Sequence, residues 1–159
     1  MAGVKVRALE RAIPQKWTCL LDSSFVLTYL HGHEPASEVA AHVVDNWVAH
    51  GRNIAIVSVI TAMEASVRPI RSNNQPALQM VMDFMRSFPN LRLVPVDANC
   101  AFEAARVRAV ASLPAPDALI VAAGLLNRVQ VILTNDRAWK SRMHRVTAKT
   151  SAIYLEDFV

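Results

Sequence analysis

Short apolar runs alternate with segments of helical spacing along this chain of 159 residues. The runs are TCLLD at 18–22, NIAIVSV at 53–59, LRLVPV at 91–96 and VQVILT at 129–134, and SAIYLEDF at 151–158 is expected to form a fifth strand. Strands that alternate with helices are typical of α/β proteins, because each helix returns the chain to the same edge of a parallel sheet. The sequence therefore predicts one α/β domain, and it contains no internal repeat or linker.

The expected helices are bounded by capping residues, glycine and proline. Ser23 or Ser24 is predicted to cap the first of them, Ser58 is predicted to cap a later one, and Pro69 is expected to end that later helix. Apolar positions at helical spacing run to His50, after which Gly51 should stop the helix. The predicted helices span about 23–32, 36–50, 59–69, 76–88, 98–112 and 116–127.

Composition excludes several classes of protein. An apolar fraction of 53% with 19% charged residues is incompatible with a disordered chain. No apolar run approaches the roughly 18 residues of a membrane span, and the N-terminus has no apolar core of a signal peptide. Cytoplasmic location, with no membrane contact, is the expectation. Cys19 and Cys100 have no metal-ligand spacing, so buried free thiols are expected. The formal net charge of +4 favours an acidic partner such as nucleic acid.

Four acidic residues stand near the carboxyl ends of predicted strands or near the starts of helices. They are Asp22, Glu64, Asp117 and Asp136. Such positions converge on one crevice at the edge of a parallel sheet. Two carboxylates about 4 Å apart repel by ~4 kcal/mol at an effective dielectric of about 20, so a cluster of four needs a cation. Oxygen ligands suit Mg²⁺ or Mn²⁺. The pattern predicts a metal-dependent enzyme that acts on phosphodiesters.

Each acid also has an ordinary interpretation when it is taken alone. Asp22 is suited to a helix cap, Asp117 to a first helical turn, Glu64 to a solvated helix face and Asp136 to a turn. The segment H-G-H-E at 31–34 lacks a second cluster of ligands and is interpreted as an exposed loop. There is no G-x-G-x-x-G, P-loop or G-x-S-x-G motif, so nucleotide cofactors and serine hydrolysis have no support.

The order of these motifs resembles that of the PIN-domain nucleases, and within them the VapC-type toxins of toxin–antitoxin pairs. The resemblance rests on Asp-Ser-Ser at 22–24 after a strand, on Glu64 in a helix, on P-x-D-A-L-I-x-A-A around Asp117 and on Thr-Asn-Asp at 134–136. It implies a PIN-like three-layer fold, with a central parallel sheet of about five strands flanked by helices. It assigns residues 17–159 to a PIN-like nuclease domain and leaves residues 1–16 as an N-terminal extension.

The resemblance further implies that the four acids hold one or two Mg²⁺ or Mn²⁺ ions and are catalytic. Asp22 and Asp117 match the most dependable ligand positions. Glu64 matches an acid that ligates or orients the nucleophile, and Asp136 matches the most variable one. The side chains expected to support these ligands are Ser23, Ser24, Thr134 and Asn135.

A basic tract, defined here as residues 137–149, directly follows Asp136 and contains no acid. It is interpreted either as a solvated surface loop or as an RNA-binding segment. Trp139 within it is expected to pack in the core or to stack on a base. The candidate RNA-binding residues are Arg137, Lys140, Arg142 and Arg145.

Four functions remain open at this stage. The leading one is an endoribonuclease toxin, blocked by a cognate antitoxin and active on RNA. The others are a housekeeping RNA-processing PIN nuclease, a non-catalytic PIN module that binds RNA or protein, and a receiver-like phosphoacceptor domain. A homodimer is also expected. Met80 and Phe84 lie off the main apolar stripe of the helix at 76–88 and need a surface to bury them, which is either a second copy of the chain or the rest of its own core.

Overall fold

A computed structural model describes residues 4–159 and contains one parallel sheet. Its strands are β1 (Thr18–Leu21), β2 (Ile54–Ser58), β3 (Leu91–Val94), β4 (Val131–Thr134) and β5 (Ser151–Tyr154), in the order β3-β2-β1-β4-β5. The central strand β1 pairs with β2 on one side and with β4 on the other. The strand order therefore reverses at β1, which makes its carboxyl end the natural position of a binding crevice.

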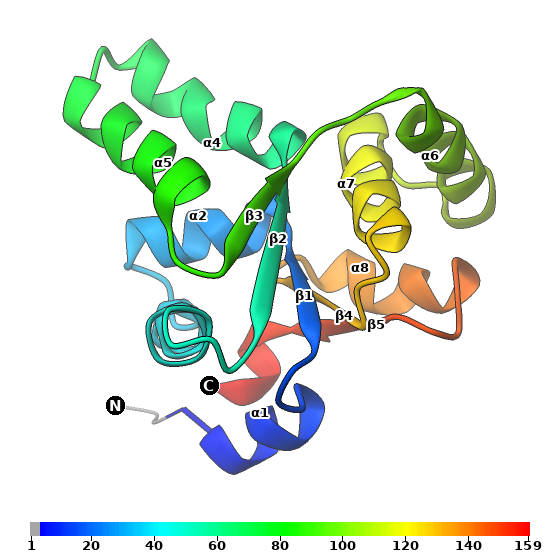
Figure 1. Ribbon diagram of the computed structural model, residues 1–159, viewed down its shortest axis with the longest axis horizontal. Coiled ribbons are helices and arrows are strands. Elements are labelled where there is room, and N and C mark those ends of the chain that lie inside the picture. Colours follow the sequence, from blue (N-terminus) through cyan, green and yellow to red (C-terminus); the bar gives the residue numbers. More distant parts are fainter. Residues whose placement is uncertain (1–3) are drawn as a thin grey trace.

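Helices cover both faces of this sheet, as predicted. They are α1 (Val6–Ala12), α2 (Ser23–His31), α3 (Ser37–Ala41), η1 (His42–Val48), α4 (Val59–Arg71), α5 (Gln75–Ser87), α6 (Ala98–Ala111), α7 (Ala115–Leu126), α8 (Arg137–Arg142), η2 (Met143–Arg145) and η3 (Leu155–Phe158). Figure 1 shows α2, α4 and α5 on one side of the sheet and α6 and α7 on the other. The expected three-layer α/β architecture is confirmed.

Alternate residues of β1 supply the two cores. Leu21 belongs to the core that includes α2, α4 and α5, whereas Leu20 belongs to the core formed with α6 and α7. Helix α7 lies so close to β1 that a Cβ atom on Gly124 would stand 2.7 Å from the Leu20 Cδ2 atom. Glycine at this position therefore permits the close approach of the helix to the sheet, and α7 is the helix that carries Asp117.

Several predicted helix boundaries are wrong. The cap of α2 is Asp22, whose carboxylate accepts a hydrogen bond from the backbone N–H of Phe25, and neither Ser23 nor Ser24 takes that role. Pro69 lies inside α4, which runs on to Arg71. Because Pro69 is in the last turn of the helix, it removes only one backbone donor near an end that already frays.

Two further segments differ from the expectation. The helix predicted over residues 36–50 is α3 followed by the π-helical turn η1, which ends before Gly51 in a left-handed backbone conformation. The basic tract is not a loop: its first part is α8, which Asp136 caps through the Ala138 N–H, and its next part is η2. Trp139 of α8 is buried in the core, as one of its two interpretations predicted.

The N-terminal segment contains an ordered helix that packs on the domain. Leu9 of α1 and Ile13 directly after it are fully buried, and the Lys5 N–H donates to the Phe158 carbonyl oxygen. Both cysteines are buried free thiols, as expected. Within residues 4–159 no single helix is long and apolar enough to cross a membrane. The pair α6 and α7 passes that test only when joined across a bend of 115°.

Candidate active site at the carboxyl ends of the strands

Asp22 directly follows β1 and is almost completely buried, with 2% of its surface exposed. Its Oδ1 atom accepts hydrogen bonds from the Phe25 N–H at 2.7 Å and from the Ser24 hydroxyl at 2.8 Å. Its Oδ2 atom accepts one from the Thr134 hydroxyl at 2.6 Å. The pKa of Asp22 is raised to about 6, mainly by burial and also by the nearby Asp117, against the lowering effect of these bonds.

The end of β4 is tied to the start of α2 by the same network. The Asn135 N–H donates to the Ser24 hydroxyl oxygen at 2.7 Å. The Asn135 amide donates to the Glu34 carboxylate at 2.8 Å, and Thr28 donates to the same Glu34 oxygen at 2.8 Å. Thr134 thus hydrogen-bonds to Asp22, and Asn135 hydrogen-bonds to Glu34. Glu34 is exposed, as expected for the H-G-H-E segment, but its contact with Asn135 was not predicted.

Glu64 lies in the second turn of α4, the helix that follows β2. Its Oε2 atom accepts a hydrogen bond from the hydroxyl of Ser23, which is the first residue of α2. The Ser23 hydroxyl is also 3.3 Å from the Thr61 hydroxyl, one turn earlier in α4. The carboxylate of Glu64 is thus held at the start of α2, directly after the end of β1 and Asp22 in the chain.

Asp117 stands in the first turn of α7 and lies within electrostatic reach of the other acids. Its pKa is raised by burial, then by the negative charges of Glu64 and Asp136, and it is lowered by a hydrogen bond from the Trp139 side chain and by the Arg142 charge. The contributions of Trp139 and Arg142 to an acidic site were not anticipated. The only available signal was their position in the basic tract that follows the T-N-D motif.

Asp136 is exposed and lies at the start of α8, where its Oδ1 atom accepts from the Ala138 N–H at 2.8 Å. Its own N–H donates to the Thr134 hydroxyl oxygen at 3.0 Å, which connects it to the buried network around Asp22. Asp136 is therefore a helix cap, as its ordinary interpretation predicted, and also a member of the acidic group.

The four acids share one edge of the sheet, and Asp117 interacts with each of the other three. None of the four forms an ion pair with lysine or arginine within residues 4–159. In the same part of the chain, no three Asp, Glu, His or Cys side chains approach closely enough to hold an ion. Their oxygens instead accept from local hydroxyl and backbone donors. The donor set consists of carboxylates, which fits a hard divalent cation such as Mg²⁺ or Mn²⁺.

The candidate RNA-binding residues differ in their surroundings. Arg137 and Arg145 are exposed. Lys140 forms an exposed ion pair with Asp157, and Arg142 donates to the Ser112 carbonyl oxygen at 3.2 Å. Arg137 and Arg145 are consequently the two least engaged cations of the four.

The sequence matches the PIN domain family over residues 19–146. A comparison with curated protein sequences gives no match. Among solved structures, similarity extends to VapBC2 from Rickettsia felis bound to a promoter DNA fragment. Its TM-score is 0.63 at 15% identity, and 86% of this chain and 98% of that chain are covered. The sarcin–ricin loop cleaving toxin VapC20 from Mycobacterium tuberculosis has a TM-score of 0.64 at 14% identity, with 77% and 93% covered.

A toxin–antitoxin complex from Klebsiella pneumoniae is also similar in structure, with a TM-score of 0.57 at 20% identity. The match covers 76% of this chain and 89% of that chain. At these identities the three structures establish that the folds are alike, and the expected likeness to VapC structures is confirmed.

Proposed function

Because this chain belongs to the PIN domain family, a family of nucleases, we propose that it is a metal-dependent endoribonuclease that hydrolyses RNA phosphodiester bonds. The observation that carries the proposal is the position of Asp117. Its pKa is raised first by burial and then by Glu64 and Asp136, and Asp117 in turn contributes to the raised pKa of Asp22. Four carboxylates at the carboxyl ends of the strands, where the strand order reverses and where Asp117 is within electrostatic reach of the other three, are suited to a cation-assisted reaction.

A bound Mg²⁺ or Mn²⁺ ion would activate water and neutralise charge on the phosphate. Asp22 and Asp117 are the principal ligands in this proposal, Glu64 ligates or orients the attacking water, and Asp136 contributes least. The chain's own hydroxyls keep these acids in place: Thr134 and Ser24 hold Asp22, whereas Ser23 holds Glu64. Fixing ligand geometry in this way strengthens metal binding.

The basic tract would bind the RNA backbone next to the acidic edge. Arg137 and Arg145 are exposed cations that follow Asp136 in the chain and suit contacts with phosphate. Lys140 and Arg142 complete the predicted set, although each already has a protein partner. A separate proposal for Arg142 is that its positive charge favours the ionised form of Asp117, because it lowers the pKa of that carboxyl.

The biological role we propose is that of the toxin of a type II toxin–antitoxin pair in the cytoplasm. The similar structures from Klebsiella pneumoniae and Mycobacterium tuberculosis, named a toxin–antitoxin complex and a toxin, support this role. The partners would be a cognate antitoxin, which covers the acidic edge, and a second copy of this chain. A housekeeping RNA-processing nuclease and a non-catalytic binding module remain the alternatives.

One experiment separates these roles. The 5′ and 3′ ends of cellular RNA are sequenced after brief expression of the intact protein and of its Asp22→Asn variant. Discrete new ends that need Asp22, with growth arrest, support the toxin, whereas new ends without arrest indicate a processing nuclease.

A second assay uses the purified protein, which should cleave RNA in the presence of Mg²⁺ or Mn²⁺ and stop cleaving when EDTA is added. RNA binding without any cleavage would identify the non-catalytic module.

A further inference from the structure

A hollow lies at the amino ends of the strands, opposite the carboxyl ends where the four acids lie. It has a volume of about 650 Å³, and the residues Gln130 and Thr150 that line it directly precede β4 and β5. The acids follow their strands, whereas this hollow stands where two strands begin. We call it the β4–β5 hollow. Its polar side chains include Arg106, Arg128, Gln130 and Lys149.

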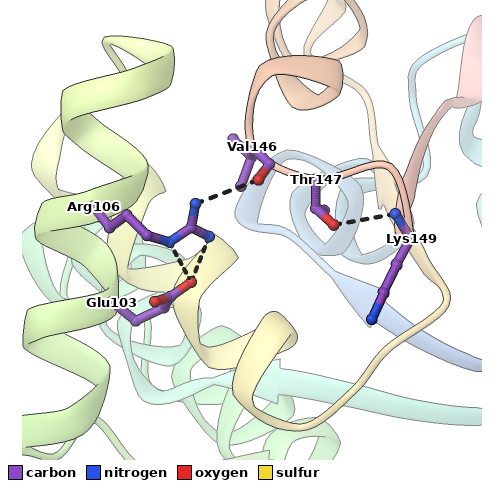
Figure 2. A network of polar contacts seen from close by, with 5 residues as sticks. All are labelled: Glu103, Arg106, Val146, Thr147 and Lys149. Carbon is purple, nitrogen blue, oxygen red and sulfur yellow. Dashed lines mark hydrogen bonds and ion pairs between the residues drawn. The ribbon is translucent and has the colours of Figure 1, made fainter.

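Arg106 forms the fixed side of the β4–β5 hollow. Its Nε and Nη2 atoms donate to Glu103 Oε1 at 3.0 and 2.6 Å, and Nη1 donates to the Val146 carbonyl oxygen at 3.4 Å. Figure 2 shows the guanidinium held between these two acceptors. A guanidinium has five N–H groups, so about two remain free to donate into the hollow. Glu103 already neutralises the charge of Arg106.

Three further polar side chains of the hollow, Gln130, Arg128 and Lys149, have donors without an acceptor in the part of the chain that the structure describes. The Gln130 Oε1 atom accepts from the Thr18 N–H at 2.7 Å, and the Gln130 amide N–H groups remain available as donors. Within residues 4–159, the guanidinium of Arg128 and the ammonium of Lys149 have neither an ion pair nor a hydrogen bond. In Figure 2 no dashed line joins the Lys149 ammonium to the Arg106 network. Three cations and one carboxylate give the hollow a net charge of +2.

Such a lining suits a phosphate group attached to a less polar body. Donors and positive charge surround the space, and the apolar side chains of Leu125, Val129 and Val146 form part of the same wall. The basic tract leads from Asp136 at the acidic edge to Lys149 at the hollow. A chain of phosphates that follows this tract would therefore reach both places.

We propose that the β4–β5 hollow binds a backbone phosphate of the RNA substrate, away from the bond that is cleaved. This inference rests on the proposed ribonuclease function and adds to it a second, remote contact that extends the RNA footprint. The contact makes affinity and salt dependence sensitive to RNA length, because only longer molecules span both sites. Arg128, Lys149 and the free N–H groups of Arg106 and Gln130 are the phosphate donors.

The backbone supplies a clean variant to test this proposal. Arg128 has a φ of 56°, in the left-handed region that glycine adopts without cost. Arg128→Gly therefore removes the charge and relieves the backbone at once, so the variant should melt at or above the temperature of the parent. Lys16 offers a matched control, since it is exposed and has a φ of 70° before β1. Lys16→Gly makes the same change outside the hollow.

Binding is measured in an Asp117→Asn background, with labelled oligoribonucleotides from about 4 to about 16 nucleotides. Arg128→Gly combined with Lys149→Gln should weaken binding of the longest RNA on the order of ten-fold and leave the shortest unchanged. Loss of two phosphate contacts should reduce the slope of log K against log salt by about 1.4. Lys16→Gly should change neither quantity. Equal losses at every RNA length, or no loss at all, would overturn the proposal.

Protection of the Lys149 amine from acylation, read by mass spectrometry, identifies the ligand. Long RNA should protect Lys149 in the intact chain, whereas RNA of about 4 nucleotides should not. Protection by inorganic phosphate but not by long RNA would overturn the RNA assignment. Protection without cleavage of any RNA would support phosphate binding in the hollow and refute the proposed nuclease activity. Cleavage without protection would refute phosphate binding in the hollow and leave the proposed nuclease activity intact.

Discussion

The Thr134 hydroxyl donates a hydrogen bond of 2.6 Å to Asp22 Oδ2, and it thereby joins the ends of β4 and β1 beneath the acidic edge. Thr134 is fully buried and Asp22 is 2% exposed. A carboxylate so far from water is retained only where donors surround it, and Thr134, Ser24 and the Phe25 N–H provide them. These donors lower the pKa of Asp22 less than burial raises it. The buried acid therefore titrates close to neutrality in the metal-free protein.

The first prediction removes that hydroxyl. Thr134→Val keeps the shape of the side chain but leaves Asp22 Oδ2 and the Asp136 N–H with one partner fewer. Unfolding free energy should fall by about 1–3 kcal/mol. The Asp22 pKa should rise further, so Mg²⁺ should stabilise the variant less at pH 6 than it stabilises the parent. Chemical denaturation with and without Mg²⁺ measures both effects.

Thr150→Val is the control for that substitution. Thr150 is 7% exposed, and its hydroxyl donates to the Val129 carbonyl oxygen at 2.8 Å, far from the acids in the fold. It should reduce stability to a similar extent while the response to Mg²⁺ stays as in the parent. An identical Mg²⁺ response in the two variants would show that the Thr134 hydroxyl does not govern the site.

The second prediction ranks the acids. Asp22→Asn and Asp117→Asn should each lower RNA hydrolysis at least ~100-fold, because each removes a negatively charged metal ligand. Asp136→Asn should lower it less, since Asp136 is exposed and also caps α8, a role that asparagine performs equally well. Initial rates at saturating Mg²⁺ measure the order, and circular dichroism checks the fold. Full activity in both of the first two variants would refute the assignment of the site.

The third prediction concerns pH in the absence of metal. The Asp22 pKa is about 6 in the folded chain and close to 3.8 when unfolded, and the Asp117 pKa is also raised. The folded state therefore binds more protons between these values. The stability that arises from the raised pKa of Asp22 is fully present below about pH 4. It is lost as the pH rises through about 6, which lowers the free energy of unfolding by on the order of 3 kcal/mol.

Adding Mg²⁺ at pH 7 should recover part of that loss, because the cation binds the folded chain only. Thermal melts from about pH 4 to about pH 8, with EDTA or with Mg²⁺, provide the measurement. The Asp22→Asn variant should lose most of the pH dependence. The prediction is contradicted if the melting temperature of the parent protein changes with neither pH nor Mg²⁺ in this range.

The positions of Asp22, Asp117 and Asp136 followed from the sequence because strand ends and first helical turns are fixed by local signals. Apolar runs of four or five residues set the strands, and the parallel order brings their carboxyl ends together. Ser58 caps its helix as predicted, for the same reason, and Asp97 caps α6 in the same way.

Contacts between segments distant in the sequence were not predictable in this way. Glu34 reaches Asn135 across 101 residues, and the Trp139 side chain of α8 hydrogen-bonds to Asp117 of α7. The inward turn of Phe84 is another case. Its place on the helix left open burial against a second copy or in the chain's own core, and it packs in the core against Tyr29 and Phe88, with ring centroids 5.2 and 5.3 Å away. Tertiary packing, and not the helical periodicity of the sequence, determines that Phe84 is buried.

The fourth prediction tests how far the N-terminal segment belongs to the domain. Leu9 is fully buried in the larger core, beyond the residues that match the PIN family. Leu9→Ala should lower the free energy of unfolding by about 2–5 kcal/mol. Leu126→Ala, at a side chain 49% exposed, should cost no more than about 0.5 kcal/mol. Urea denaturation compares them, and equal stabilities would make residues 1–16 a dispensable extension.

The last prediction concerns assembly through α5. Met80 is 59% exposed on this helix, whereas Phe84 is 6% exposed, so only Met80 is available to a second copy. Phe84→Glu would place a charge in the core and unfold the chain. Met80→Glu instead leaves the core intact and opposes burial of this face between two copies. In a two-fold dimer both copies carry the new charge, which doubles the effect of one substitution.

The parent should scatter light as a dimer of about twice 17.5 kDa, and Met80→Glu should give the monomer mass with an unchanged melting temperature at low concentration. Leu126→Glu, the same kind of change at the end of α7, should leave the dimer intact. A monomeric parent at about 50 µM, above the Kd of even a weak specific dimer, would refute self-association through α5. That result would leave the acidic site unaffected, because its four acids lie within a single chain.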